Sequence, residues 1–387
     1  MKDKFKVKEF IDFMGRDSGY ITDEFERIYD LDCMYNYIFG KRNNGKTVLM
    51  CAFAVWIWTQ CGGIKSAVVR RFKEQIKSTI FSNYFNCLLF SSSGRNIISE
   101  LTNGSYTKVV YYLRDFYLAY TDENGNTIKE NEPFCRAFAV SEMENDKSVT
   151  YPGIEAIWYE EFLTHGYYLK NEYVLFQNVI STCARDPMHL PKVFLIGNTV
   201  DKYCPYFSEL EIDIDTIDKD TIHTFEYENE DGPPLRIAVW RTGEGSNIQK
   251  KSNVLFATKN SRLRMITSGE WEIPMYPHLD QKYRDVDIMG EFFIDYNHKL
   301  LHGEVIGQNN GVYIFMHKKT SEIKKPERDI IYSLYASSRP NVFNSLFSSD
   351  SPAYELISYC YRNNKIFFDT NESGSLFERF IKETSKR

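Results

Sequence analysis

Residues 40–47 constrain the fold of this chain more than any other segment. They read Gly-Lys-Arg-Asn-Asn-Gly-Lys-Thr, which matches the GxxxxGKS/T phosphate-binding loop. An apolar run at 35–39 precedes the loop and another begins at Val48, which predicts a buried strand, the loop and then a helix. Backbone N–H groups of such a loop and the helix N-terminus surround phosphate oxygens. The expected nucleotide-binding residues are Gly40, Lys41, Arg42, Asn43, Asn44, Gly45, Lys46 and Thr47.

Two residues at the end of this loop carry the predicted chemistry. In phosphate loops the lysine reaches the β- and γ-phosphates, and the hydroxyl that follows it binds Mg²⁺. We therefore expect Lys46 to contact ATP and Thr47 to be a metal ligand. The charged residues inside the loop, Lys41 and Arg42, either contact phosphates as well or face solvent.

A second landmark is the apolar segment 154–162, which contains two adjacent acids, Glu160 and Glu161. An apolar strand ending in Asp-Glu is the Walker B pattern, in which one acid holds Mg²⁺ and the other activates water. Here Glu160 stands where Asp is usual, and its additional methylene leaves the geometry of metal binding open. We expect Glu160 to bind the metal and Glu161 to orient or deprotonate the attacking water, although paired acids after a strand are also common on surfaces.

Polar residues also end two other expected strands. Arg70 and Arg71 follow the apolar run 67–69, and Asn198 follows the run 193–197. Ligands bind beyond the carboxyl ends of parallel strands, so these side chains would lie on the nucleotide side of the sheet. Arg70 is therefore a candidate nucleotide-binding residue. Asn198 is a candidate γ-phosphate sensor at the end of a strand inserted between the two Walker strands, and the alternatives are a solvated arginine pair and a simple strand-terminating turn.

Length and composition limit the class of protein. At 387 residues the chain accommodates two domains, taking about 150 residues for each. A net charge of −6 argues against a generally basic nucleic-acid coat but allows a local basic surface. The eight cysteines show no metal-binding spacing, which predicts reduced thiols in a cytosolic protein. The longest apolar run, 48–58, is about half of the ~20 residues that a membrane span requires, so no membrane association is expected.

The pattern of elements predicts an α/β protein in three parts. Residues 1–205 would form a mainly parallel sheet around the loop, 206–252 an acidic linker or small subdomain, and 253–387 a smaller mixed α/β domain. The turn at 123–126 predicts an antiparallel hairpin at a sheet edge. Further expected strands are 134–140, 291–296, 303–307, 311–316 and 365–368, and expected helices are 173–182, 353–361 and 375–382.

The order of these motifs resembles the DNA-packaging ATPases of small short-tailed phages, which are compact relatives of the large terminase subunits. The resemblance is carried by the phosphate loop, the strand ending in Arg70 and Arg71, the segment 146–153 before the Walker B strand, and the strand ending at Asn198. Residues 204–207, Cys-Pro-Tyr-Phe, and the C-terminal hairpins extend it over nearly the whole chain.

The resemblance implies an ATPase of the ASCE class that drives double-stranded viral DNA into a preformed prohead. It implies a ring, pentameric in that family, at the portal vertex in the host cytoplasm, bridged to the portal directly or through a structural RNA. A free subunit could be monomeric. Arg185 occupies the position of an arginine finger acting on the neighbouring subunit, and Lys147 matches a second basic residue proposed for that role. Without the resemblance, Arg185 would be an ordinary arginine at a helix C-terminus.

The resemblance also implies that the C-terminal domain has an RNase H-like fold. A two-metal nuclease requires three or four convergent carboxylates, and the sequence offers Asp295 and Asp369 at strand ends without a convincing third. A vestigial, non-cutting domain is therefore expected, and a full terminase with an active nuclease and a nucleotide-binding switch with little turnover are the alternatives. Two basic clusters either contact nucleic acid or are solvated: Lys250, Lys251, Lys259, Arg262 and Arg264, and Lys318, Lys319, Lys324 and Lys325.

Overall fold

The computed structural model divides the chain into two compact units. The first comprises Met1–Leu163 and Glu172–Glu272, and the second comprises Thr164–Asn171 and Ile273–Arg387. The structure describes residues 4–15, 22–42, 44–143, 149–164, 166–184, 190–230, 232–243, 275–279, 282–308 and 311–384.

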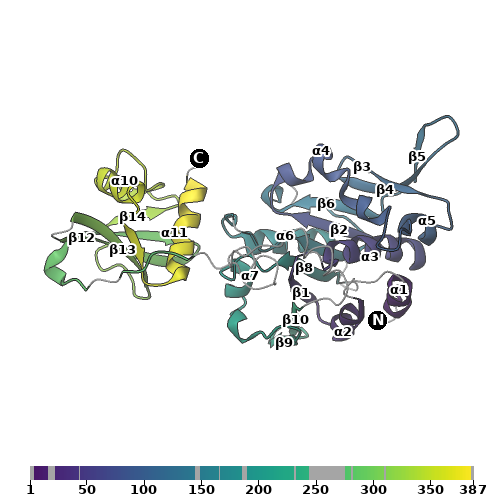
Figure 1. Cartoon of the computed structure of the whole chain (residues 1–387), viewed down its shortest axis with the longest axis horizontal. Helices are drawn as coiled ribbons and strands as arrows, with labels where there is room; N and C mark the ends of the chain where they lie inside the picture. The colour runs from purple at the N-terminus through teal and green to yellow at the C-terminus, as the bar shows by residue number, and fades with distance from the viewer. Residues whose placement is uncertain are drawn as a thin grey trace. The chain divides into compact units, whose positions relative to one another are not determined.

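One large, mostly parallel sheet forms the centre of the first unit (Figure 1). Among the described residues it has ten strands in the order β3-β4-β6-β2-β7-β8-β1-β10-β9, with β5 paired to β4. The run from β6 to β10 is parallel throughout, and β9, β4, β3 and β5 join it antiparallel. The strands are β1 (Tyr35–Gly40), β2 (Lys65–Arg70), β3 (Lys108–Tyr112), β4 (Asp115–Thr121), β5 (Thr127–Lys129), β6 (Cys135–Ala139), β7 (Ile154–Glu160), β8 (Lys192–Asn198), β9 (Ile222–Tyr227) and β10 (Leu235–Thr242).

This sheet confirms the predicted arrangement of the two landmark strands. The strand β8 lies between β1, which precedes the phosphate loop, and β7, which ends in the acid pair. The turn after Thr121 joins β4 to β5 at the sheet edge, as its sequence predicted. Both faces of the central strands are buried, which explains their continuous apolar sequences.

Helices cover both faces of the first sheet. One face packs against α2 (Thr22–Asp30) and α3 (Lys46–Gln60), and α1 (Val7–Met14) packs on these two helices. The other face packs against α6 (Glu172–Cys183) and α7 (Pro205–Ser208). The shorter helices are α4 (Ser78–Phe81) and α5 (Ile97–Leu101). Because α3 is apolar on nearly every side, it is a core helix, and Phe53 at its centre contacts Phe10, Phe25 and Phe194 at ring-centroid distances of 5.3, 5.4 and 6.2 Å.

Residues 206–243 differ from the linker or subdomain that their composition suggested. The acids of this stretch flank β9 and β10, and β10 pairs in parallel with β1 from Tyr35 opposite Ile237 to Gly40 opposite Thr242. The segment therefore completes the sheet of the first unit. Most of its exposed acids precede or follow β9, the strand at the sheet edge, and β9 itself carries the exposed Glu226.

The second unit is a smaller mixed α/β domain, as its sequence predicted. Its sheet order is β15-β14-β11-β12-β13-β16, and α10 (Tyr354–Arg362) and α11 (Asn371–Thr384) pack on one face, where Phe292, Ile314 and Phe380 lie in the core. The strands are β11 (Ile288–Tyr296), β12 (Lys299–Gln308), β13 (Gly311–Lys319), β14 (Ile330–Ser333), β15 (Val342–Phe343) and β16 (Ile366–Phe368).

The described helices include none with the length and apolar character needed to cross a lipid bilayer.

We predict that Phe53→Ala lowers the free energy of unfolding of the first unit by about 3–5 kcal/mol, because it leaves a cavity in the aromatic core between α3 and the sheet. Ile80→Ala is the control, since 61% of Ile80 is exposed, and it should cost less than about 0.5 kcal/mol. Urea unfolding followed by tryptophan fluorescence measures both values. Equal effects of the two substitutions would contradict the core position of Phe53.

Candidate nucleotide-binding site

The loop between β1 and α3 requires glycine at both glycine positions of the GxxxxGK pattern. Gly40 has φ +155°, and a Cβ there would lie 2.1 Å from Thr242 Oγ1 on the neighbouring strand. Gly45 precedes α3 with φ +84°, in the left-handed region that glycine tolerates. The chain can therefore turn sharply from β1 into α3 and direct the helix N-terminus at the space above the loop.

Lys46 is buried and hydrogen-bonded within the loop. Its Nζ donates to the carbonyl oxygen of Lys41 at 2.7 Å and to Asn44 Oδ1 at 2.8 Å. The amide of Asn44 donates in turn to Thr242 Oγ1 at 2.7 Å, which ties the loop to β10. Burial lowers the pKa of Lys46 to about 7, with the charge of Arg42 acting in the same direction and that of Glu160 opposing it. A phosphate group beside Nζ would favour the charged form.

Thr47 and Glu160 meet across the site. Thr47 Oγ1 donates to Glu160 Oε1 at 2.7 Å, which joins the first turn of α3 to the end of β7. The other oxygen, Oε2, accepts a hydrogen bond from the hydroxyl of Tyr84 at 2.7 Å, and Trp158 Nε1 donates to that hydroxyl at 2.9 Å. Burial raises the pKa of Glu160, and the hydrogen bonds from Tyr84 and Thr47 oppose this shift. A hydroxyl and a carboxylate at this separation are oxygen ligands that suit Mg²⁺.

Glu161 differs from its neighbour in exposure and backbone conformation. Its side chain is 56% exposed, and Oε2 pairs with Arg70 Nη2 at 2.8 Å. Its φ of 59° lies in the left-handed region, which is uncommon for a residue other than glycine, asparagine or aspartate. The backbone N–H of Glu161 donates to the carbonyl oxygen of Ile196 at 2.9 Å. The turn directs the second acid away from the strand, and the structure places Arg70 beside that acid.

Arg71 is a buried positioning residue that the sequence did not reveal. Its Nε lies 2.8 Å from Glu172 Oε2, and its Nη2 donates to the carbonyl oxygen of Phe162 at 2.6 Å. Its Nη1 donates to the carbonyl oxygen of Glu161 at 3.3 Å. The arginine thus holds the turn that carries Glu161. The sequence expectation had grouped Arg71 with Arg70 on the ligand side, and nothing in the sequence marks Glu172, at the start of α6, as its partner.

Most of the predicted residues that the structure describes line one cavity of about 320 Å³, whereas the expected residues Gly40, Lys41 and Arg70 are not part of its lining. Asn198, at the end of β8 and opposite Gly40 in the strand register, lies on its wall together with Lys46 and both acids. The full lining is Arg42, Asn44, Gly45, Lys46, Thr47, Val48, Glu160, Glu161, Ile196, Gly197 and Asn198. The expected residues Asn43, Lys147, Arg185, Lys250, Lys251, Lys259, Arg262 and Arg264 lie outside the described residues.

The loop joins a buried strand to a core helix, and its threonine contacts an acid on β7, which β8 separates from β1. This arrangement defines the P-loop class of nucleotide-binding folds.

Within that class, the chain shares its fold with viral packaging motors. It is similar to the phi28 gp11 DNA packaging motor, with a TM-score of 0.52 and 14% identity over 93% of this chain and 96% of that one. It is also similar to a chain of the bacteriophage phi29 viral genome packaging motor assembly, with a TM-score of 0.51 and 17% identity over 92% and 98% of the two chains. Neither a protein-family model nor a curated protein sequence matches.

We predict that Arg71→Met destabilises the protein by about 3–5 kcal/mol, because it leaves Glu172 buried without its cation. The matched control is Glu132→Gln, which breaks the pair between Lys65 Nζ and Glu132 Oε2 at 2.8 Å, where the acid is 66% exposed. The control should cost less than about 1 kcal/mol. Urea unfolding of the two variants gives the comparison, and similar costs would show that the Arg71 pair is not a strong buried contact.

The lowered pKa of Lys46 predicts a pH dependence of stability. Between about pH 7 and the pKa near 10.4 of an unfolded lysine, the unfolded chain holds a proton that folded Lys46 has released. Stability therefore rises with pH across this range and is lost as the pH falls toward 7. Relative to Lys46→Met, the wild-type free energy of unfolding should increase by at least about 1 kcal/mol from pH 7 to pH 9 without nucleotide. A constant difference between the two proteins across that range would show that Lys46 stays charged.

Proposed function

We propose that this chain is an ATP-hydrolysing motor that moves double-stranded viral DNA into a preformed prohead. The observation that carries the proposal is the Thr47–Glu160 contact with Glu161 beside it, on the wall of one cavity at the phosphate loop. The similarity in fold to packaging motors over more than nine-tenths of both chains supports the same reading.

The residues of the cavity have distinct proposed roles in hydrolysis. The loop amides and Lys46 bind the phosphates of ATP, and Thr47 and Glu160 hold Mg²⁺, which when bound neutralises charge on the phosphate oxygens. Glu161 orients and deprotonates the attacking water, since its carboxylate is exposed to the cavity while that of Glu160 is occupied by two hydroxyl groups. Arg70 holds the Glu161 carboxylate in place.

Three other residues complete the proposed motor. Asn198 faces the same cavity from β8 and would respond to the γ-phosphate. Arg185 is the proposed trans-acting arginine of a neighbouring subunit, and Lys147 is the second basic candidate. The proposal therefore includes a ring, with five subunits in the resembling family, at the portal of the prohead in the host cytoplasm, with a structural RNA as a candidate bridge.

The chain path suggests how hydrolysis reaches the second unit. Thr164–Asn171, which begins three residues after Glu161, belongs to that unit. There the ring of Tyr168 lies 4.9 Å from the guanidinium carbon of Arg379 on α11, and Lys170 Nζ lies 4.0 Å from the ring centroid of Tyr335. A conformational change at the Glu161 turn would therefore be transmitted along the chain through Phe162 and Leu163 alone before it reached the second unit.

We further propose that the second unit is an RNase H-like domain without nuclease activity. The proposal is supported by the strand order β15-β14-β11-β12-β13, in which β12 is antiparallel to both neighbours and β14 and β15 are parallel to β11, with β16 added beside β13. Asp295 near the end of β11 is opposite Ser333 on β14, where a second carboxylate would be needed. Asp369 follows β16, three strands away from β11, a spacing of about 14 Å.

This arrangement disfavours the alternative of an active terminase nuclease. Two-metal cleavage requires carboxylates that converge on a pair of ions about 4 Å apart. Asp295 and Asp369 do not meet that requirement, and among the described residues neither belongs to a metal-type cluster of three or more ligands. The second alternative, a nucleotide-binding switch, would use the same cavity. It differs from a motor in that it would hydrolyse ATP only slowly.

We predict that double-stranded DNA stimulates ATP hydrolysis by the wild-type chain and that Glu161→Gln lowers kcat by about 10²–10⁴-fold, because the general base is lost. The affinity for a fluorescent ATP analogue should remain within about threefold, since the phosphate loop is unchanged. The control is Glu155→Gln at the opposite end of β7, which should hydrolyse ATP at nearly the wild-type rate.

Two results would contradict parts of this proposal. Nucleotide binding by the wild type without turnover, even with DNA and proheads present, would favour the switch. Cleavage of plasmid DNA in the presence of Mn²⁺ that is abolished by Asp295→Asn would support the alternative of a terminase with an active nuclease.

A further inference from the structure

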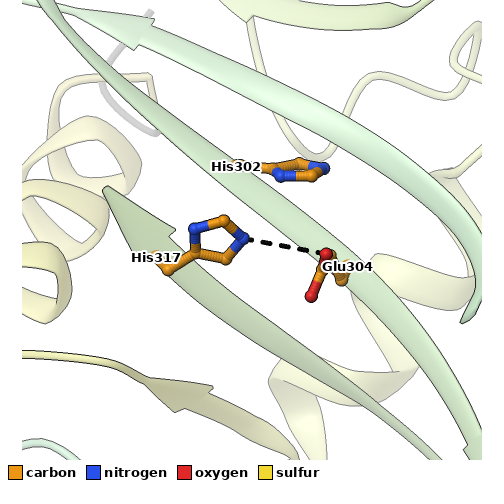
Figure 2. A group of neighbouring side chains, drawn as sticks. All are labelled: His302, Glu304 and His317. Atoms are coloured by element: carbon orange, nitrogen blue, oxygen red, sulfur yellow. Dashed lines mark ion pairs between the residues drawn. The ribbon is translucent and has the colours of Figure 1, made fainter. Parts of the chain in front are cut away.

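Two histidines and a glutamate meet on the face of the second-unit sheet that α10 and α11 do not cover. His302 on β12 is directly opposite His317 on β13, and Glu304 is two residues further along β12. Since side chains two apart on a strand share a face, all three side chains lie on the same side of the sheet. Figure 2 shows the two imidazole rings and the carboxylate grouped across these two strands.

The three side chains offer nitrogen and oxygen atoms at metal-site spacing. One ligand atom from each residue lies within 4.8 Å of the other two, and His317 Nε2 lies 3.8 Å from Glu304 Oε1. Around a tetrahedral Zn²⁺ with bonds of about 2.0–2.2 Å, ligand atoms are about 3.4 Å apart. Side-chain rotations that move the ligand atoms by about 1 Å would therefore close the cluster around one ion.

Packing holds the two rings in place. The ring of His302 stacks on Phe293 at 4.6 Å with an interplanar angle of 18°, and His317 stacks on Phe315 at 5.6 Å. Glu304 accepts a hydrogen bond from the hydroxyl of Tyr283. This support limits the rotamers of all three ligands before any ion binds, which lowers the entropy cost of binding.

One nitrogen of the cluster, His302 Nε2, makes no hydrogen bond to any described residue. His302 is only 9% exposed, and its Nε2 is buried without a hydrogen-bond partner among the described residues. The nearest opposite charge is Glu291 Oε1 at 3.3 Å, on the strand neighbouring β12. A buried nitrogen without a hydrogen bond is unfavourable, and coordination to a cation would remove that cost.

We propose that His302, Glu304 and His317 bind a divalent transition-metal ion of the Zn²⁺ type. Two imidazoles and one carboxylate suit zinc and its neighbours in the first row, whereas Mg²⁺ and Ca²⁺ prefer oxygen ligands throughout. Glu291 is positioned to orient His302 or to supply a fourth ligand. Lys319 Nζ lies 5.9 Å from the centroid of the Phe293 ring, and its positive charge opposes cation binding on this face. This site is chemically distinct from the proposed Mg²⁺ site at Thr47 and Glu160.

The test uses the full chain, stripped of metal with EDTA and titrated with ZnCl₂ in a calorimeter. One ion should bind per chain, and His317→Gln and Glu304→Gln should each weaken binding by at least about 100-fold. The matched control His298→Gln alters an exposed-turn histidine of the same domain and should bind as the wild type does. Replacing Zn²⁺ by Co²⁺ should give visible absorption bands that His302→Phe removes.

The result that would overturn the proposal is equally specific. No stoichiometric binding by the wild type would show that the cluster is not a metal site. Binding that survives in His317→Gln but is lost when Cys61 and Cys87, the two cysteines that are only partly buried, are replaced by serine would show the same. The urea unfolding midpoint and the far-ultraviolet circular dichroism spectrum of metal-free His317→Gln should match those of the wild type, which verifies that this variant folds.

Discussion

The hydrogen bond between Thr47 and Glu160 is the contact on which the candidate site depends. It joins the first turn of α3 to the end of β7, although 113 residues separate the two in sequence and β8 lies between their strands. The contact exists only because β1, β8 and β7 are parallel and end at the same edge of the sheet. A slip of one residue in β7 would turn Glu160 to the opposite face and remove this carboxylate from Thr47.

A second constraint holds Glu161 in its unusual backbone conformation. A left-handed glutamate costs about 1–3 kcal/mol and persists only where neighbouring contacts determine it. Here Arg71 donates to the carbonyl oxygens of Glu161 and Phe162, while its side chain is fixed by Glu172. The hydroxyls of Tyr159 and Tyr206 also donate to Glu172, at 2.8 and 3.0 Å. The buried pair of Arg71 and Glu172 thus helps to direct the two adjacent acids apart. Glu160 lies against Thr47, and Glu161 lies against Arg70.

The sheet of the second unit differs in chemistry between the end of β11 and its uncovered face. At the end of β11, Asp295 is opposite Ser333 on β14. On the uncovered face of the same sheet, the strand register instead brings histidines together. Oxygen ligands at the phosphate loop and imidazoles on this face would select different ions, so the two units need not compete for the same metal.

The sequence by itself determined the phosphate loop, the acid pair and most strands and helices, because these depend on local glycine spacing and on apolar runs. It also indicated the inserted strand ending at Asn198. It did not indicate that residues 235–242 complete the sheet beside β1, since the acids before and after the edge strand β9 made this stretch resemble a linker. Only the tertiary structure decided that Arg70 contacts Glu161 while Arg71 is buried on Glu172, and that His302, Glu304 and His317 form one cluster. Those contacts depend on strand order and register, which join residues far apart in the chain and leave no periodic trace in the sequence.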